Sequence, residues 1–362
     1  MEKTFTELIH DVQEQGKCSH CGGCVTFCSA VNYGALELTP EGKPVYSDQD
    51  KCVKCGLCYS ICPQTSELDP EIRQMAGWKP PMGKIISVAV TRAKDREIRE
   101  KGTDGGVVTA ILAHLLDTGK IDGAIVSRDT DQGRSPCLTF TREGILESAG
   151  SHFGTSQGMV RFAEAYGTFS PSLEALANLR QSPLGRIAFV GTSCQINTIR
   201  KMQALKILPA DSIRYCLGLF CSGNFSFTGI LFDSLEEKYG FKRQDIRKIN
   251  IKESFLFTLA SGETVPVPIE ELSPVKREAC NFCGDFSAEY ADISFGGLGA
   301  ENGWTTAIVR SSAGKEIFDL ARDKVLESYP FDKNPKTIAQ AEEKILSHSE
   351  RKKEKARAFR TW

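Results

Sequence analysis

The runs CSHCGGCVTFC, at residues 18–28, and CVKCGLCYSICP, at residues 52–63, decide how the first part of this chain folds. Each run carries four cysteines separated by two, two and three residues, and equivalent cysteines lie 34 positions apart, which indicates an internal duplication. Three thiolates on a tight loop can bind three corners of a [4Fe-4S] cube, while the fourth, on the following helical turn, points at a neighbouring cube. The spacing therefore predicts two such clusters.

Ligation crosses between the two runs in this pattern. The predicted sets are Cys18, Cys21, Cys24 and Cys62, and Cys52, Cys55, Cys58 and Cys28. On these residues the sequence resembles a bacterial-type ferredoxin domain over about residues 14–66. Ser29 stands where the pattern has a proline after Cys28, whereas Pro63 follows Cys62 as expected. Zinc knuckles and disulfides are the alternatives, and eight cysteines in register favour clusters.

The chain is long enough for at least one further domain. Its 362 residues are 41% hydrophobic and carry a net charge of -1, which gives no reason to expect nucleic acid or a membrane surface as a partner. We find no run of about 18 apolar residues for a membrane span, and no secretory signal. Fourteen cysteines that include cluster ligands fit a reducing compartment. We therefore expect a cytoplasmic protein, peripheral to a membrane only through a partner complex.

The composition and the positions of proline and glycine predict an α+β chain in four parts. After Pro63, prolines at 70, 80 and 81 interrupt any long element, and a domain boundary is expected near Gly83. The parts are a two-cluster ferredoxin domain at 1–66, a linker at 67–83, a mixed α/β domain at 84–334 and a charged C-terminal helix at 335–362.

Both ends of the chain have helical patterns. Phe5, Leu8, Ile9 and Val12 lie at the spacing of a short amphipathic helix within residues 1–15, which packs on its own domain or on a partner. The C-terminal run RKKEKARAFRTW predicts a solvated face, with Phe359 and Trp362 as candidates for docking on a partner.

Strand-like and helical runs alternate in the predicted α/β domain. The strand-like runs are IISVAVT, DGAIVSR, RIAFVGTSC, ADISFGGLG and TTAIVR, and the helical runs are GVVTAILAHLLDTG, INTIRKMQAL, TGILFDSLEEKYG and AGKEIFDLARDK. The segment IRKINIKESFLFTLASGETVPVPI predicts an antiparallel hairpin that turns at Ser261 and Gly262.

Four further cysteines predict a third metal centre: Cys194, Cys221, Cys280 and Cys283. The CxxC pair supplies two ligands on one turn, and cysteines at strand ends can supply the others. Cys216 is a rival, but we expect it on the same strand as Cys221 and facing the other side, because side chains alternate. Cys137 is expected to be an ordinary thiol. Spacing alone leaves a structural zinc site open, and the first two clusters favour iron and sulfur.

A Gly-rich turn opens the helical run in KGTDGGVVTAILAHLL. Small residues let a ligand approach the backbone, and free amides at a helix start favour a phosphate. The segment is neither a Walker nor a GxGxxG pattern, so a tight helix-entry turn without a ligand is the alternative.

A second resemblance rests on KGTDGGVVTA, GTSCQI, GLFC, CNFCGDF, ADISFGGLG and NGWTTAIVR, over about residues 84–332. Together these segments are similar to the beta-subunit family of coenzyme F420-reducing hydrogenases and dehydrogenases. With the ferredoxin module in front, the arrangement resembles the input subunit of F420H2 dehydrogenases. The resemblance implies a bound FAD, a [4Fe-4S] cluster close to it, and reversible hydride exchange with the deazaflavin coenzyme F420.

The resemblance also implies which residues bind FAD: Gly102, Thr103, Asp104, Gly105, Gly106 and Thr109, joined by Gly191, Thr192 and Ser193. The family more often has serine at the position of Asp104. A carboxylate is repelled by a pyrophosphate, so we expect Asp104 to meet a ribose or flavin hydroxyl.

A further loop, GSHFGTSQGMVRF, resembles the family's next cofactor loop and is expected to border the substrate entrance through Ser151, His152, Thr155, Ser156 and Arg161. His152 is a candidate for tuning the flavin or an ordinary packed histidine. Lys101, Arg128 and Arg161 either attract an anionic coenzyme tail or form surface ion pairs.

Together with the cysteine sets, the resemblance implies a coenzyme F420-dependent oxidoreductase subunit with FAD and three [4Fe-4S] clusters. FAD converts hydride into single electrons for the clusters, so no Ser/His/Asp or paired-carboxylate chemistry is expected of the side chains. The alternatives are a ferredoxin-dependent reductase of another hydride acceptor and a non-catalytic electron-wiring subunit. The expected partners are a hydrogenase, formate dehydrogenase, heterodisulfide reductase or membrane dehydrogenase complex.

Overall fold

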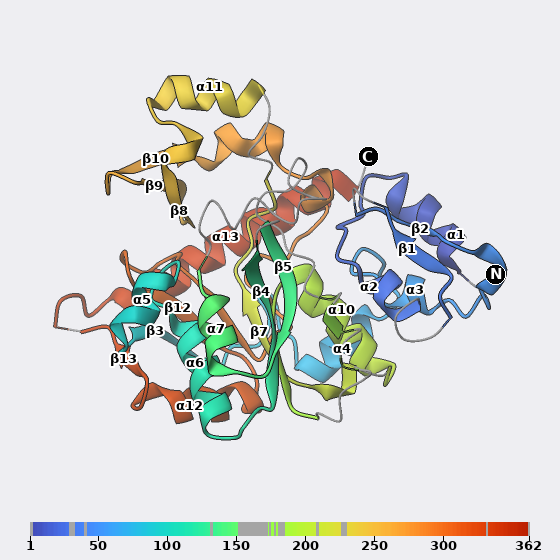
Figure 1. The fold of residues 1–362 in the computed structure, drawn as a ribbon, viewed down its shortest axis with the longest axis horizontal. Coiled ribbons are helices and arrows are strands. Elements are labelled where there is room, and N and C mark those ends of the chain that lie inside the picture. Colours follow the sequence, from blue (N-terminus) through green and yellow to red (C-terminus); the bar gives the residue numbers. More distant parts are fainter. Residues whose placement is uncertain are drawn as a thin grey trace.

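The protein is described by a computed structural model, in which the described residues are 3–28, 33–39, 42–130, 133–150, 173, 175–176, 179, 185–207, 210–225, 230–330 and 332–360. They form an N-terminal module beside a large sheet with helices on both faces, a small three-stranded sheet, and a long C-terminal helix (Figure 1). The predicted α+β class is confirmed. No helix in this described part of the chain is both long and apolar enough to cross a membrane.

The N-terminal module repeats its backbone as well as its cysteines. Helices α2 (Gly23–Val25) and α3 (Leu57–Ser60) each follow a glycine in the left-handed region, Gly22 at φ 79° and Gly56 at φ 73°. Two residues earlier, His20 and Lys54 have φ of 53° and 57°. Left-handed residues reverse a chain within a few positions, so each run curls its thiols around one loop.

An apolar core joins the two halves of the module. Helix α1 (Phe5–Leu8) continues as the π-helical turn η1 (Ile9–Gln13), as the sequence predicted, and buries Phe5, Leu8 and Val12. Strands β1 (Leu36–Leu38) and β2 (Pro44–Tyr46) pair antiparallel, and a 3-10 turn, η3 (Gln49–Lys51), leads into the second run.

The large sheet has the order β13-β3-β12-β11-β7-β6-β4-β5. Strands β11, β7, β6 and β4 run parallel, and the remaining neighbours pair antiparallel. Their bounds are β3 (Ser87–Ala93), β4 (Gly123–Thr130), β5 (Gly133–Thr139), β6 (Ile187–Thr192), β7 (Ile213–Leu219), β11 (Ile293–Gly296), β12 (Thr305–Val309) and β13 (Leu326–Ser328). The carboxyl ends of the four parallel strands therefore meet at one edge of the sheet.

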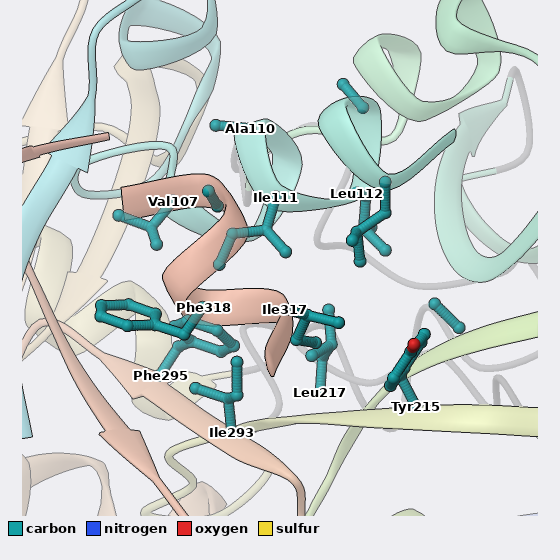
Figure 2. Packing of buried hydrophobic residues seen from close by; sticks show 14 of the residues in the cluster. Val107, Ala110, Ile111, Leu112, Tyr215, Leu217, Ile293, Phe295, Ile317 and Phe318 are labelled. Carbon is teal, nitrogen blue, oxygen red and sulfur yellow. The ribbon is translucent and has the colours of Figure 1, made fainter. Parts of the chain in front are cut away.

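Helices α6 (Val107–Asp117) and α12 (Ser312–Arg322) cover one face of the sheet. Figure 2 shows Ile111 of α6 and Phe318 of α12 packed over Ile293 and Phe295 of β11. Each such side chain contributes about 1.5–3 kcal/mol when it leaves water, so this face fixes α6 firmly against the parallel strands. Two short helices flank α6 in the chain: α5 (Arg96–Lys101) and α7 (Arg142–Glu147).

Helix α10 (Ser193–Ala204) and helix α4 (Asp69–Ala76) pack on the opposite face. Helix α4 lies within the predicted linker, and its Ile72 is fully buried in the core under α10. Residues 67–83 are thus not a free connection, because Pro70 takes a first-turn position that a helix tolerates.

The small sheet contains β8 (Ile246–Ile251), β9 (Ser254–Leu259) and β10 (Thr264–Pro268), with helix α11 (Ile230–Tyr239) packed nearby. The predicted hairpin is confirmed, because β9 pairs antiparallel with β10 and Gly262 turns at φ +88°. Short 3-10 segments complete the connections: η5 (Ala210–Ser212), η6 (Arg243–Asp245), η7 (Ile269–Val275) and η8 (Glu278–Asn281).

The C-terminal helix α13 (Thr337–Arg360) crosses the molecule toward the N-terminal module (Figure 1). It is helical as predicted, but it is not only a solvated face, since it buries Ala341, Ile345 and Ala356. Phe359 packs on Phe282 of the same chain, with ring centroids 5.9 Å apart. Trp362 lies outside the described residues.

Candidate functional site

The eight cysteines of the N-terminal module line two separate hollows. Cys18, Cys21, Cys24 and Cys62 line one, which we call the inner set, and Cys28, Cys52, Cys55 and Cys58 line the other, the outer set. The structure thus brings together the crossed groups that the spacing predicted. Burial raises the pKa of Cys18 to about 11 and that of Cys58 to about 12. In the described residues, no group of three or more His, Cys, Asp or Glu side chains is arranged to hold a single metal ion.

A third group of thiols gathers where several elements of the large domain end. Cys194 is the second residue of α10, Cys221 lies two residues beyond β7, and Cys280 and Cys283 lie in and after η8. We call these four residues the third set. The thiol of Cys194 interacts electrostatically with Cys283 and Cys221, and that of Cys221 with Cys280 and Cys283. The backbone amide of Asn224 donates to Cys280 Sγ at 3.3 Å.

The two remaining cysteines lie apart from the third set. Cys216 is fully buried in the core beneath α10, where burial raises its pKa to about 12. The expectation that it would share a strand with Cys221 was wrong, because β7 ends at Leu219. Cys137 lies on β5 at the border of the core that contains α6.

The inner set lies against the third set through helix α10. The hydroxyl of Thr198 donates to the backbone oxygen of Cys194 at 3.1 Å and lies 3.9 Å from Cys21 Sγ. The thiols of Cys194 and Cys21 also interact electrostatically. One buried side chain therefore contacts a member of each set.

Two buried cationic side chains of the large domain bind the N-terminal module beside α10. Lys201 is completely buried and donates to the backbone oxygens of Cys62 at 2.9 Å and Thr65 at 2.6 Å. Burial lowers the pKa of Lys201, while the nearby Asp69 carboxylate opposes that effect. Arg277 donates to the backbone oxygen of Ser19. Lys201 thus binds the carbonyl of the inner-set Cys62, and Arg277 binds that of Ser19, which follows Cys18, so the module has a fixed position there.

A cavity of about 380 Å³ opens at the carboxyl ends of the parallel strands. Such an edge is where open α/β sheets bind their ligands. The wall includes Ser127 within β4, Thr192 at the end of β6 and Gly296 at the end of β11. Cys221 of the third set also lines it. The cavity and the third set therefore share a wall.

Most of the predicted FAD-binding residues line this cavity: Gly102, Thr103, Asp104, Gly106, Thr109, Gly191 and Thr192. Gly106 is the N-cap of α6 at φ 69°, and a Cβ there would lie 2.7 Å from the Ile98 carbonyl oxygen. Only glycine fits such a site without strain. The start of α6 thus has free amides and a bare backbone facing the hollow.

Two predicted residues lie just behind the wall. Gly105 packs against Arg92 and its amide donates to Thr305 Oγ1 at 3.0 Å, so it shapes the turn from the outside. Ser193 is the first residue of α10 and is 2% exposed, and its hydroxyl has no hydrogen-bond partner among the described atoms.

Asp104 is the one charged side chain among the described residues of the cavity wall. Burial raises the pKa of its carboxyl, and Lys252, the hydrogen bond from Asn250 and Lys248 oppose that rise. Asn250 Nδ2 donates to Asp104 Oδ1 at 2.7 Å and to the Thr103 carbonyl at 2.8 Å. The small sheet therefore holds the Gly-rich turn, an arrangement that no pattern in the sequence predicted.

The remaining candidates divide into two groups. Lys101 pairs with Glu97 at 2.8 Å and Arg128 with Glu147 at 3.6 Å, both at the surface. The second group lies outside the described residues: Ser151, His152, Thr155, Ser156 and Arg161.

Sequence reasoning missed the cations beside the third set. Lys352 of α13 donates to the backbone oxygens of Cys221 at 2.6 Å and Asp285 at 2.8 Å. Burial by itself lowers the pKa of Lys352, but Cys283, Cys221, Cys280 and Asp285 outweigh it and raise the pKa. Lys276 also lies near these thiols, and burial lowers its pKa. Lys352 lies in a run of charges with the composition of a solvated helix, so no local signal distinguishes it.

Comparison with protein families finds three matches along the chain. The models described as "Coenzyme F420 hydrogenase/dehydrogenase, beta subunit", N-term and C terminus, match residues 88–160 and 184–334. A 4Fe-4S dicluster domain matches residues 10–63.

Individual relatives agree with these matches. The coenzyme F420 hydrogenase subunit beta of Methanosarcina barkeri is 30% identical over 263 residues, which cover 70% of this chain and 84% of the relative. The coenzyme F420-dependent sulfite reductase of Methanocaldococcus jannaschii is 29% identical over 326 residues, covering 85% of this chain and 46% of that protein. A chain of the F420-reducing [NiFe] hydrogenase complex from Methanosarcina barkeri superposes with a TM-score of 0.66 at 27% identity, covering 78% of this chain and 93% of that chain.

Proposed function

Because the chain belongs to the coenzyme F420 hydrogenase/dehydrogenase beta-subunit family and carries a 4Fe-4S dicluster domain, we propose that it is the flavin-containing electron-input subunit of a redox complex. It exchanges hydride between coenzyme F420 and FAD and passes single electrons through three [4Fe-4S] clusters to or from a partner subunit. The observation that carries this proposal is the wall shared by the cavity and the third set, which contains Cys221.

The cavity residues fit a flavin nucleotide. The bare turn before α6 offers backbone amides to a phosphate, and the carbon-rich wall beside it, which includes Val107, Val190 and Phe295, suits an aromatic ring. Asp104 lies on the same turn and repels a pyrophosphate, so we assign it to a hydroxyl of the ribose or the flavin. Bound FAD supplies the conversion between hydride and single electrons.

The side chains position the reactants and limit water. Val108, Leu112 and Leu219 line the cavity with carbon, which lowers the local dielectric around a transferring hydride. The proposal assigns no proton transfer to a side chain of this wall. The shape of this wall would orient the ring of coenzyme F420 for hydride transfer to bound FAD.

The three thiol sets form a sequence from the cavity to the surface. The third set touches the cavity, the inner set meets it through Thr198, and the outer set ends at Cys55, which is exposed beside Val53 at 55% exposure. We propose that electrons follow this order and leave or enter near Cys55.

A second candidate is a ferredoxin-dependent reductase of another hydride acceptor, in which electrons would enter near Cys55 and pass through the three thiol sets to the flavin. The exposure of Cys55 favours it as much as the first candidate, since a one-electron donor can approach there. A wiring subunit with a decayed flavin site is less well supported, because the cavity and its glycine turn are both intact.

Anaerobic stopped-flow mixing of the reconstituted protein with reduced F420, reduced ferredoxin or NADH tests these candidates. The proposal predicts flavin bleaching and then cluster reduction with reduced F420 alone. Reduction by ferredoxin with F420 inert would instead establish the second candidate. A preparation with all clusters but unable to bind FAD would establish the wiring subunit.

A further inference from the structure

Helix α13 places one ammonium group between two of the loops that carry the third set. Lys352 Nζ donates to the backbone oxygen of Cys221 at 2.6 Å and to that of Asp285, two residues after Cys283, at 2.8 Å. The same loops are joined by a backbone hydrogen bond from Cys221 to Phe286 at 2.8 Å. Lys352 therefore has a fixed position next to the thiols.

Neighbouring contacts hold the end of α13 in place. Phe359 packs on Phe282, which lies between Cys280 and Cys283, and the guanidinium of Arg360 donates to the Phe282 carbonyl at 3.1 Å. His348, one turn before Lys352, packs its ring on Phe286, with centroids 5.6 Å apart. The helix is therefore anchored on both sides of Lys352.

The charge of Lys352 acts on whatever the four thiolates bind. A cluster gains one negative charge when it is reduced, and a cation at short range inside the protein favours that form. Two other charged groups lie near these thiols and Lys352: Lys276, whose charge adds to the effect, and Asp285, whose charge opposes it. Hydrogen bonds from Lys352 go to carbonyls and not to sulfur, so its main action is through its charge.

We infer that Lys352 is a positioning residue that sets the redox potential of the third cluster, making the centre beside the flavin cavity easier to reduce. This inference rests on the proposed function, because it requires a [4Fe-4S] cluster at the third set. The redox potential of the cluster beside the flavin cavity would then depend on α13, the last helix of the chain.

The test is an anaerobic potentiometric titration followed by electron paramagnetic resonance, on the full chain with iron counted first. K352Q removes the charge and keeps a hydrogen-bond donor, K352R keeps the charge, and K355M changes an exposed lysine on the same helix. At the wild-type midpoint of the third cluster, we expect K352Q to lower its reduced-to-oxidised ratio about tenfold, a shift of about 59 mV to more negative potential. K352R and K355M should stay close to the wild type.

Two results would overturn the inference: a K352Q protein with full iron and an unchanged midpoint, or loss of the third cluster from K352R despite its charge. Loss of the third cluster from K352Q alone would also overturn it, because the charge would then be needed to bind the cluster and not to set its potential. A wild-type protein that binds only about eight irons would refute the third cluster itself, and so the proposed function, before any variant is compared.

Discussion

The N-terminal module and the large domain gather cysteines in different ways. In the module, eight cysteines come from two runs of 11 residues each, 34 positions apart, and the turns at Gly22 and Gly56 repeat with them. In the large domain, the four cysteines of the third set span positions 194 to 283 and meet because a helix start, a strand end and a 3-10 turn share one edge of the sheet. A site whose ligands are close in sequence tolerates change elsewhere in the chain. The third set, whose ligands are far apart in sequence, depends on every element that positions this edge of the sheet.

Removing the CxxC pair of the third set should have the largest effect. The double variant C280S/C283S should lose about four of roughly twelve irons, since two of four ligands disappear, while the module keeps its clusters. Iron analysis and electron paramagnetic resonance measure this. C137S, on β5, is the control and should keep all iron. Unchanged iron in the double variant would contradict the assignment of the third set.

A side chain at position 106 should prevent FAD binding and leave the clusters of the N-terminal module in place. In G106V the new Cβ would collide with the Ile98 carbonyl, so the turn must move and FAD should be lost, as measured by flavin absorbance after gel filtration. Gly119 is a matched control, because its φ is also positive, +64°, but a Cβ there meets no atom within 4 Å. Full FAD retention in G106V, or equal loss in G119V, would argue against this loop.

Removing the hydroxyl of Thr198 should slow transfer between the two regions without loss of iron. T198V keeps the shape of the side chain and removes the group between Cys21 Sγ and the Cys194 carbonyl, so reduction of the module after flavin bleaching should slow a few-fold. T198S keeps the hydroxyl and should transfer at the wild-type rate. Stopped-flow absorbance measures both, and equal rates in T198V and T198S would exclude this contact from the path.

The smallest expected effect is the pH dependence of stability from Glu289. Burial, helped by Asp285, raises the pKa of Glu289 from 4.5 to about 7, against the opposing Lys353 and Trp78. A carboxyl with a raised folded-state pKa stabilises the fold below pH 4.5, and that contribution, about 3 kcal/mol, is lost as the pH rises from 4.5 through 7.

Melting temperatures of the wild type and E289Q between pH 5 and 8 test this expectation. The wild type should lose about 2–4 °C relative to E289Q across that range. E263Q, which changes an exposed glutamate in the β9–β10 turn, is the control and should follow the wild type. A wild type and an E289Q variant that follow the same pH profile would refute a raised pKa.

The ferredoxin module could be predicted from the sequence because its ligand spacing is local. Helix α6 and its glycine turn could also be predicted, because the Gly-rich turn and the apolar positions of the helix lie next to each other in the chain. The membership of the third set also followed from short Gly-flanked contexts, although the reason given against Cys216 was wrong. Cys216 lies in the core below α10, and Cys221 lies beyond the end of β7.

Other parts of the site depend on contacts between distant segments. Asn250 reaches Asp104 across 146 positions, and Lys352 reaches the carbonyl of Cys221 across 131. Neither residue belongs to a motif, and the charged run around Lys352 has the composition of an exposed helix. Helix α4 in the predicted linker was missed for a related reason, since its one fully buried residue, Ile72, gives almost no periodic signal.

In the proposed relay, electrons from the flavin reach the N-terminal module through the third set. The most direct test of this relay is anaerobic mixing of C280S/C283S, loaded with FAD and the two remaining clusters, with reduced F420, followed by rapid freezing and electron paramagnetic resonance. We predict that the flavin bleaches while both clusters of the module stay oxidised. Reduction of those clusters at the wild-type rate would contradict the relay and require a direct path from the flavin cavity to the inner set.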